Sequence, residues 1–407
     1  MRPRMAWLAF ALLATGCGSS GAVEAVVTTT TSATTTIPTT TSTTTSTTIT
    51  LPATTTSTST TTTTTLVPED GRTAAERTLT EVAVITGDIA PKSIVASGDG
   101  LYVAQNMMYR HTVTVYDRNF ELVGTISDTV VLSDFGHEGF EGEYRGAPVE
   151  AAFTSGGEHV YVSNYEMYGP GLRGGAGDRC SPGQWPDSFV YRIDTGRLAI
   201  DQVIAVGSVP KFLAVTPDDR LILVSNWCSY DLSVIDVETA TETARVEIGR
   251  YPRGIAVAPD SSTAYIAVMG SNRVKVLDLD SLEIVGEVVV GTSPRHLVLS
   301  PDGALLYASL NGEGRLAKVD LSTGDVIGRV ATGDAPRSMA ISDDGTALYV
   351  VNYRSGTVSK VRTGDMTEIQ EVRAGYHPIG ITYDPANRQV WVSNYGGTIQ
   401  VFDDRSD

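Results

Sequence analysis

Three stretches of the chain share one pattern: PRGIAVAPDSSTAYIAV at residues 252–268, PRHLVLSPDGALLYASL at residues 294–310, and PRSMAISDDGTALYVVN at residues 336–352. Each begins with proline and a basic residue and continues as two runs of alternating apolar residues around an acidic turn. Such runs, joined by such a turn, predict a β-hairpin. The prolines that open the pattern recur every 42 residues, at positions 210, 252, 294, 336 and 378.

Two earlier copies of the repeat begin at Pro91 and Pro148, 57 and 62 residues before the next copy, so they carry net insertions of 15 and 20 residues. A third strand ends in aspartate in five copies, and a fourth strand runs to glycine in five, so each repeat holds four strands. Four strands in a repeat of this length predict one blade of a β-propeller.

The seventh copy ends after its third strand, at Asp404. Its missing strand has a counterpart at the start of the domain, because residues 80–91 (TEVAVITGDIAP) match residues 367–378 (TEIQEVRAGYHP). Pairing the N-terminal strand with the last blade would remove an open sheet edge, which otherwise invites aggregation. We therefore predict an all-β, seven-bladed propeller over residues 78–404, with four antiparallel strands per blade and a three-plus-one closure.

Several copies carry a short motif at the end of the second strand: Tyr161-Val-Ser-Asn164, Leu223-Val-Ser-Asn226, Tyr349-Val-Val-Asn352 and Trp391-Val-Ser-Asn394. These motifs resemble the YVTN-repeat β-propeller family and, more broadly, the lactonase-like seven-bladed propellers. At the Asn position we assign Gln105 in blade 1, Val268 in blade 4 and Leu310 in blade 5. The resemblance implies an extracytoplasmic surface or binding protein, but a shared fold does not fix a ligand.

The N-terminus has the form of a secretory signal: Arg2 and Arg4, an apolar run, and small residues before Cys17. The Ala-Thr-Gly-Cys sequence resembles a bacterial lipoprotein signal, whose cysteine is lipidated. We predict a signal peptide at residues 1–16, a lipidated Cys17 and a cell-surface protein held outside the cytoplasm by its lipid anchor. A plain secretory signal is the alternative.

Residues 28–65 contain 26 threonines, 5 serines and no charged side chain. Such a segment has little to bury, so we predict that residues 17–77 form a disordered linker. The formal charge of −17 argues against nucleic-acid binding, which depends on neutralising phosphates. We expect a monomer that meets the membrane only through its lipid anchor.

Both insertions, within residues 126–147 and 165–187, should lie on one face of the propeller. Inserted loops on a rigid scaffold are a usual place for recognition, so we expect this face to bind a protein, a glycan or a small anionic ligand. The second insertion holds Cys180, and Cys228 lies in the matching loop of the next blade. We predict a disulfide between them; two free thiols are the alternative.

Five basic residues follow the repeat prolines, and we call them the cation ring: Lys92, Lys211, Arg253, Arg295 and Arg337. Innermost strands line a propeller's channel, so these side chains should surround its mouth. They can bind an anion or carboxylate, or each can pair with an acidic group or carbonyl of its neighbour. Candidate ligand contacts beside them are Glu150, Tyr165 and Trp227.

The first insertion is rich in acidic residues, and its candidate metal ligands are Asp134, His137, Glu138, Glu141 and Glu143. Oxygen ligands at this density would suit a divalent cation such as calcium. The alternative is that these carboxylates fold back onto the cation ring.

Three functions remain open at this point. We favour a non-catalytic binding or scaffold module and assign no catalytic residue. A lactonase- or lyase-like enzyme would use the cation ring to hold a substrate carboxylate and His137 or Glu138 as acid or base. A purely structural envelope protein is the third candidate.

Overall fold

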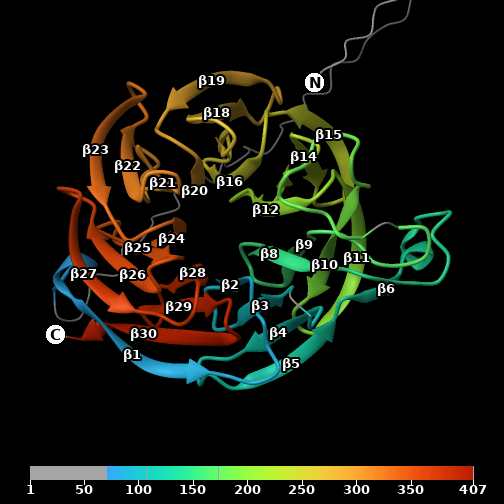
Figure 1. The fold of residues 1–407 in the computed structure, drawn as a ribbon, viewed down its shortest axis with the longest axis horizontal. Helices are drawn as coiled ribbons and strands as arrows, with labels where there is room; N and C mark the ends of the chain where they lie inside the picture. The colour runs from blue at the N-terminus through green and yellow to red at the C-terminus, as the bar shows by residue number, and fades with distance from the viewer. Residues whose placement is uncertain (1–70, 108, 173, 407) are drawn as a thin grey trace, which may run out of the picture. The chain divides into compact units, whose positions relative to one another are not determined.

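The structure, a computed structural model, describes residues 71–107, 109–172 and 174–406. Seven four-stranded antiparallel sheets stand around a common axis (Figure 1). Their innermost strands contact one another in order around this axis, and the last contacts the first. The predicted seven-bladed propeller is therefore confirmed. The predictions for the signal peptide, for Cys17 and for the threonine-rich segment fall on residues outside those described.

The strands of each blade are given from the innermost outward. Blade 1 contains β2 (Ser93–Ala96), β3 (Tyr102–Asn106), β4 (Thr112–Tyr116) and β5 (Leu122–Ser127). Blade 2 contains β8 (Pro148–Phe153), β9 (His159–Asn164), β10 (Ser188–Asp194) and β11 (Ala199–Val206). Blade 3 contains β12 (Pro210–Val215), β13 (Leu221–Asn226), β14 (Asp231–Asp236) and β15 (Thr241–Glu247). Blade 4 contains β16 (Pro252–Val257), β17 (Thr263–Val268), β18 (Arg273–Asp278) and β19 (Ile284–Val289).

The remaining blades follow the same plan. Blade 5 contains β20 (Pro294–Leu299), β21 (Leu305–Leu310), β22 (Arg315–Asp320) and β23 (Asp325–Ala331). Blade 6 contains β24 (Pro336–Ile341), β25 (Ala347–Asn352), β26 (Thr357–Arg362) and β27 (Thr367–Arg373). Blade 7 contains β28 (Pro378–Asp384), β29 (Gln389–Asn394), β30 (Thr398–Ser406) and β1 (Thr78–Ile85).

The ring closes in blade 7, where β1 from the start of the domain pairs antiparallel with β30 from its end. Ile85 lies opposite Ile399, and Thr80 lies opposite Asp403. A buried ion pair between Lys360 of β26 and Asp404 of β30 joins blade 6 to this closing sheet. The three-plus-one closure predicted from the sequence match is therefore confirmed, and it leaves no gap between the first and last blades.

Repeat glycines at the end of the fourth strand are explained by close packing against the next blade. A β-carbon on Gly333 would lie 2.7 Å from Cβ of Asn352, and one on Gly375 would lie 2.7 Å from Cγ of Asn394. The motif asparagine in turn donates from its amide nitrogen to hydroxyls on the third strand, such as Ser359 at 2.7 Å from Asn352. At these two junctions a side chain larger than glycine's hydrogen would meet the asparagine of the next blade.

Blade 1 differs from the sequence assignment by one residue. Asn106, and not Gln105, pairs with the start of the third strand, and its amide nitrogen lies 3.0 Å from the hydroxyl of Thr114. Gln105 instead lies opposite Ser93, which is the position that Ser163 takes opposite Glu150 in blade 2. The assignment was wrong because it matched Tyr102 with Tyr161, whereas Tyr102 lies opposite Ala96, the place that Val160 takes opposite Phe153.

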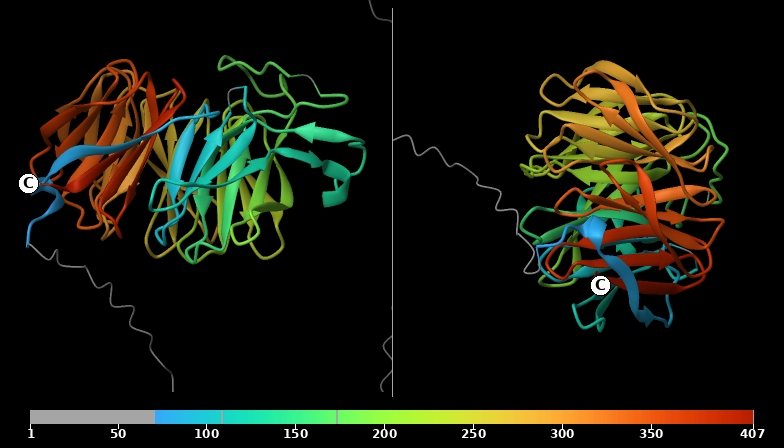
Figure 2. Two further views of the ribbon diagram at one scale, coloured as in Figure 1. Left: turned by 90° about the horizontal axis from the view of Figure 1, so that it is seen from below. Right: turned by 90° about the vertical axis from the view of Figure 1, so that its left-hand side faces the viewer.

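The first insertion lies beside the second, because Arg145 and Tyr168 pair through two backbone hydrogen bonds of 2.8 and 2.7 Å, but it does not lie over the channel mouth. It forms β6 (Thr129–Val131), the 3₁₀ turn η2 (Leu132–Phe135) and β7 (Glu143–Arg145), and it packs along β11, the outermost strand of blade 2 (Figures 1 and 2). Apolar contacts hold it there, because Leu132 and Tyr144 are buried against Phe189 and Val203. Burying these side chains outweighs any attraction of the loop's carboxylates to the channel.

The helical content of the described residues is small. It consists of η1 (Ala74–Glu76) and η2. In the described ranges no helix has the length and apolar character that crossing a bilayer requires.

Candidate functional site

The cation ring lies where the innermost strands begin, at one end of the channel. Four of its members are the second residue of an innermost strand, and Lys92 directly precedes β2. The innermost strands that carry them contact one another in order around the channel, so the five side chains lie near enough to repel one another. Burial, and then the charges of Arg337, Lys211, Arg253 and Arg295, hold the pKa of Lys92 well below its usual value. The structure therefore brings all five predicted cations within one another's field.

The same effects act on the arginines. Burial, followed by repulsion from Arg337 and Arg253, holds the pKa of Arg295 well below its usual value. Burial lowers the pKa of Arg337 to about 10. Each of these shifts means that the charged form is disfavoured in the protein as it stands. An anion bound beside these side chains would lower the free energy of their charged forms.

One cation of the ring has an acidic partner. Lys211, 8% exposed, forms an ion pair with Asp178 from the second insertion. Burial lowers the pKa of Lys211 to about 7, although Asp178 opposes that shift. Trp227 and Tyr165 flank the same ammonium group, with ring centroids 3.9 and 5.1 Å from Nζ.

The other four cations lack a carboxylate partner in the part of the chain that the structure describes. Arg253 donates to the backbone carbonyl of Lys211, and Arg295 lies 3.8 Å from the sulfur of Met269. Arg337 stacks on Tyr353 with its guanidinium carbon 3.5 Å from the ring centroid, and Lys92 lies 5.1 Å from that of Tyr395. Pairing with neighbours therefore accounts for Lys211 and Arg253 and leaves three cations without a carboxylate or carbonyl partner among the described residues.

Two titratable groups lie beside the ring. Glu150, 7% exposed, accepts a hydrogen bond from Ser93, and burial raises its pKa to about 7 despite the opposing effects of that bond and of Arg253. His296 accepts a hydrogen bond at Nδ1 from the backbone N–H of Met339 at 3.3 Å. Burial and the nearby arginines lower the pKa of His296 to about 3, so its imidazole is neutral near pH 7.

The second insertion is fastened over blade 3. The predicted disulfide between Cys180 and Cys228 is present, with the two Cα atoms 5.4 Å apart. Trp227 donates from Nε1 to the backbone carbonyl of Asp178 at 2.9 Å, and the hydroxyl of Tyr165 lies 3.2 Å from the Asp178 carboxylate. Trp227 and Tyr165 are 5% and 7% exposed, so they hold this loop in place.

Sequence reasoning missed Asp178. Asp178 lies inside an insertion, so it has no counterpart in the other repeats from which its place could be predicted. The signal that was available is the cysteine pairing: Asp178 lies two residues before Cys180, so a bridge to Cys228 in blade 3 carries it toward Lys211.

The five acidic-insertion residues lie along the outer edge of blade 2, away from the cation ring. Nε2 of His137 lies 2.8 Å from the backbone carbonyl of Val203. Among the described residues, the ligand atoms that gather closely enough to share an ion are those of His159, Asp194 and Asp201. Those carboxylates are already engaged, since Asp201 accepts two bonds from Arg192 at 2.8 and 3.1 Å.

Comparison with known proteins supports the fold. Residues 187–348 match the profile of the YNCE-like beta-propeller, and residues 315–407 match that of the lactonase, 7-bladed beta-propeller. A solved structure of Kuenenia stuttgartiensis hydrazine synthase is similar with a TM-score of 0.64 and 19% identity, over 79% of this chain and 98% of that chain. No curated protein matches. The chain is a seven-bladed β-propeller similar to the YNCE-like and lactonase propellers, with a cation ring at the mouth of its channel.

Proposed function

We propose that this protein is a non-catalytic binding module that takes a small carboxylate-bearing anion at the mouth of the propeller channel. The observation that carries the proposal is the set of three ring cations, Lys92, Arg295 and Arg337, that have neither a carboxylate nor a carbonyl partner among the described residues. In this proposal the lipid anchor at Cys17 and the threonine-rich linker present the module outside the cytoplasm.

Electrostatics favours an anion with more than one negative group. Clustered and partly buried positive charges repel one another, and a bound anion replaces that repulsion with charge-assisted hydrogen bonds. Arginine suits this task because its planar fork can bind a carboxylate through two donors. Asp178 already supplies one carboxylate to Lys211, so the ligand's groups would go to the opposite side of the ring.

A second candidate function is supported by Glu150. A buried carboxyl with a pKa of about 7 suits general acid–base chemistry at neutral pH, and it lies beside a site for an anionic substrate. The match of residues 315–407 to a lactonase profile favours the same class. In that case Glu150→Gln would abolish turnover of a lactone acid but leave its binding intact.

The test is calorimetric titration of the purified protein with citrate at low ionic strength. We expect binding that weakens with added salt and is lost in Arg295→Glu, because that change inverts one charge of the ring. Arg315→Gln, on the exposed surface of β22, is the matched control and should bind as the parent does. Equal citrate affinity in the parent and in Arg295→Glu would contradict the proposal.

A further inference from the structure

Two groups of side chains, three repeats of 42 residues apart, form the same stack beside the channel mouth. We call the first group the covered stack. In it, Lys211 lies over the ring of Trp227, and Trp227 stacks on Tyr251 with 4.4 Å between the ring centroids. The guanidinium carbon of Arg250 lies 4.6 Å from the centroid of the Tyr251 ring. We call the second group the open stack. In it, Arg337 lies over the ring of Tyr353, and Tyr353 stacks on His377 with 4.2 Å between the ring centroids. His377 in turn stacks on Tyr376 with 3.9 Å between the ring centroids.

The covered stack shows what such an arrangement binds. The protein's own second insertion lies across it, with the Asp178 carboxylate on the ring cation. Polar atoms of the aromatic rings hold the peptide backbone: Trp227 donates to the carbonyl of Asp178, and Tyr230 and Tyr251 donate to the carbonyl of Cys180 at 2.6 and 3.4 Å. One cation thus binds an aspartate side chain, and three aromatic side chains bind two backbone carbonyls of the same segment.

The open stack has no such cover among the described residues. Tyr376 is 68% exposed at its outer end. At its inner end, Nε of Arg337 is buried and has no hydrogen-bond acceptor in the described part of the chain. Lys92 and Tyr395 extend the surface toward blade 1, since Tyr395 meets Tyr353 edge-on at 6.5 Å and carries Lys92 over its face.

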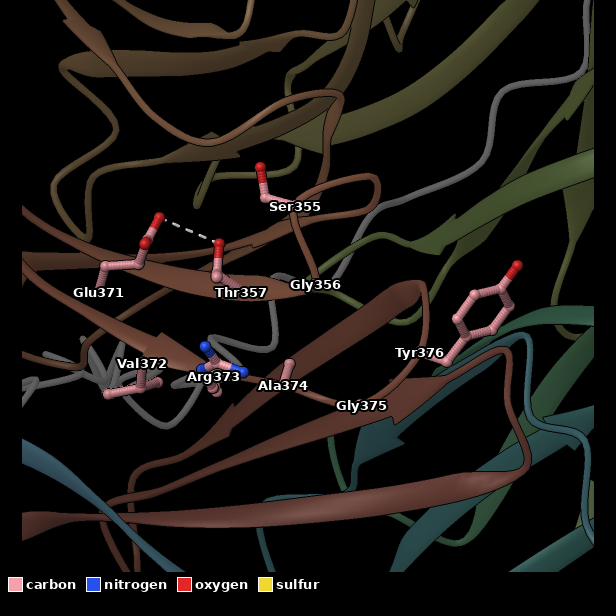
Figure 3. Close-up of a pocket in the computed structure, with 9 residues that line it drawn as sticks. All are labelled: Ser355, Gly356, Thr357, Glu371, Val372, Arg373, Ala374, Gly375 and Tyr376. Atoms are coloured by element: carbon pink, nitrogen blue, oxygen red, sulfur yellow. Dashed lines mark hydrogen bonds between the residues drawn. The ribbon is translucent and has the colours of Figure 1, made fainter.

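A polar hollow continues outward from the open stack. Tyr376 borders a pocket of about 620 Å³ between the ends of β26 and β27 (Figure 3). Thr357 and Glu371, which line it, are joined by a hydrogen bond of 3.1 Å from the threonine hydroxyl, and Arg373 also lines it. A chain that crosses the aromatic rings would reach this pocket with its next residues.

We propose that the open stack binds an acidic peptide segment of another protein, in the way that the covered stack binds residues 176–180 of this chain. This inference rests on the proposed anion site, because the segment's carboxylate would lie on Arg337 and Lys92. Its backbone would lie along Tyr353, His377 and Tyr376. Because the covered stack already holds a peptide in the corresponding place, a peptide is favoured over a glycan.

The probe is a blocked pentapeptide, Ala-Gly-Asp-Arg-Ser, which copies residues 176–180 with serine in place of the cysteine. We expect calorimetry with the whole protein to show binding that Arg337→Gln weakens about tenfold or more and Tyr376→Ala weakens about fivefold. Replacing the peptide's Asp by Asn should weaken binding about tenfold. Asp334→Ala is the matched control, because Asp334 occupies the position of Tyr376 one repeat earlier; it should bind the peptide as the parent does.

Citrate and an oligogalacturonate, run beside the peptide, separate the outcomes. Citrate binding that is unchanged in Tyr376→Ala, together with weakened peptide binding, supports the inference. If citrate binds but the peptide does not, the inference fails and the proposed function stands. If neither binds, both fail. If oligogalacturonate binds through Tyr376 and the peptide does not, the open stack is a glycan site and the inference is overturned.

Discussion

At the scale of single residues, Asp128 is a carboxyl group that the fold buries at a cost. Its side chain is 0% exposed, and neither oxygen has a hydrogen-bond partner in the described part of the chain. Nδ1 of His111 approaches to 3.6 Å but lies closer to the carbonyl of Gly146, at 2.6 Å. Burial raises the pKa of Asp128 to about 8, against the opposing charge of Arg145.

This burial predicts a pH-dependent stability. Between about pH 4, where the unfolded chain loses this proton, and pH 8, the native state holds more protons, so the free energy of unfolding falls as pH rises. Asp128→Asn removes the ionisation. We expect urea unfolding to show that the variant gains stability relative to the parent by roughly 1 kcal/mol per pH unit across that interval.

The control for Asp128 is Asp260→Asn, an exposed turn residue whose pKa is lowered by hydrogen bonds to Ser262. Its stability relative to the parent should not rise between pH 4 and pH 8. Unfolding free energies of Asp128→Asn and the parent that run parallel over this interval would show that Asp128 is not buried in its neutral form.

At the scale of elements, the pair of Lys360 and Asp404 joins β26 to β30. Lys360 also donates to the backbone carbonyl of Arg77 at 2.9 Å, and Tyr349 donates to Asp404. Burial lowers the pKa of Lys360 and raises that of Asp404, so desolvation opposes the charged form of each. The pair thus orients the closing blade more than it stabilises it.

Removing one partner should be costly. We expect Asp404→Ala to lower the free energy of unfolding by about 3–5 kcal/mol, because Lys360 would be left buried without a counter-charge. The double variant Lys360→Met/Asp404→Leu should recover most of that loss. Denaturant titration of the three proteins checks this, and a double variant no more stable than Asp404→Ala would contradict the desolvation argument.

Like the pair of Lys360 and Asp404, the disulfide joins two elements, since it fixes the second insertion over blade 3. Its closed loop spans a sequence separation of 48 residues. We expect Cys180→Ser/Cys228→Ser to lose about 2–4 kcal/mol of stability. The same change should raise the affinity for citrate, because a looser loop lets Asp178 leave Lys211. Thermal unfolding and calorimetry check the two effects, and unchanged values for both would mean that the bridge does not hold the loop.

What the sequence predicts at this scale depends on repetition. The blades, their closure and the position of the cation ring all follow from a pattern that recurs in seven copies, the last five of which begin 42 residues apart. Neither insertion recurs in another blade, so the sequence does not predict where either loop packs. The apolar residues Leu132 and Tyr144 decided where the first insertion packs, and their burial partners on blade 2 are distant in sequence.

At the scale of the whole molecule, β1 is the element that makes the propeller a closed ring. Deleting residues 71–85 would leave β30 with an unpaired edge, and such edges template association. We expect the shortened chain to form oligomers and to unfold at lower temperature than a reference chain that begins at Gly71. Size-exclusion chromatography with light scattering measures this, and a shortened chain that stays monomeric would show that β1 is dispensable for closure.

The central claim is that the cation ring is an anion site, and the chain's small number of lysines allows a direct measurement. It has five: Lys92 and Lys211 in the ring, and Lys275, Lys318 and Lys360 elsewhere. After reductive ¹³C-methylation, NMR can follow the titration of the reactive lysines with and without citrate. We expect citrate to raise the lowered pKa values of Lys92 and Lys211 and to leave the methyl signals of Lys275 and Lys318 at their positions. Identical titration curves for Lys92 in the presence and absence of citrate would contradict the claim.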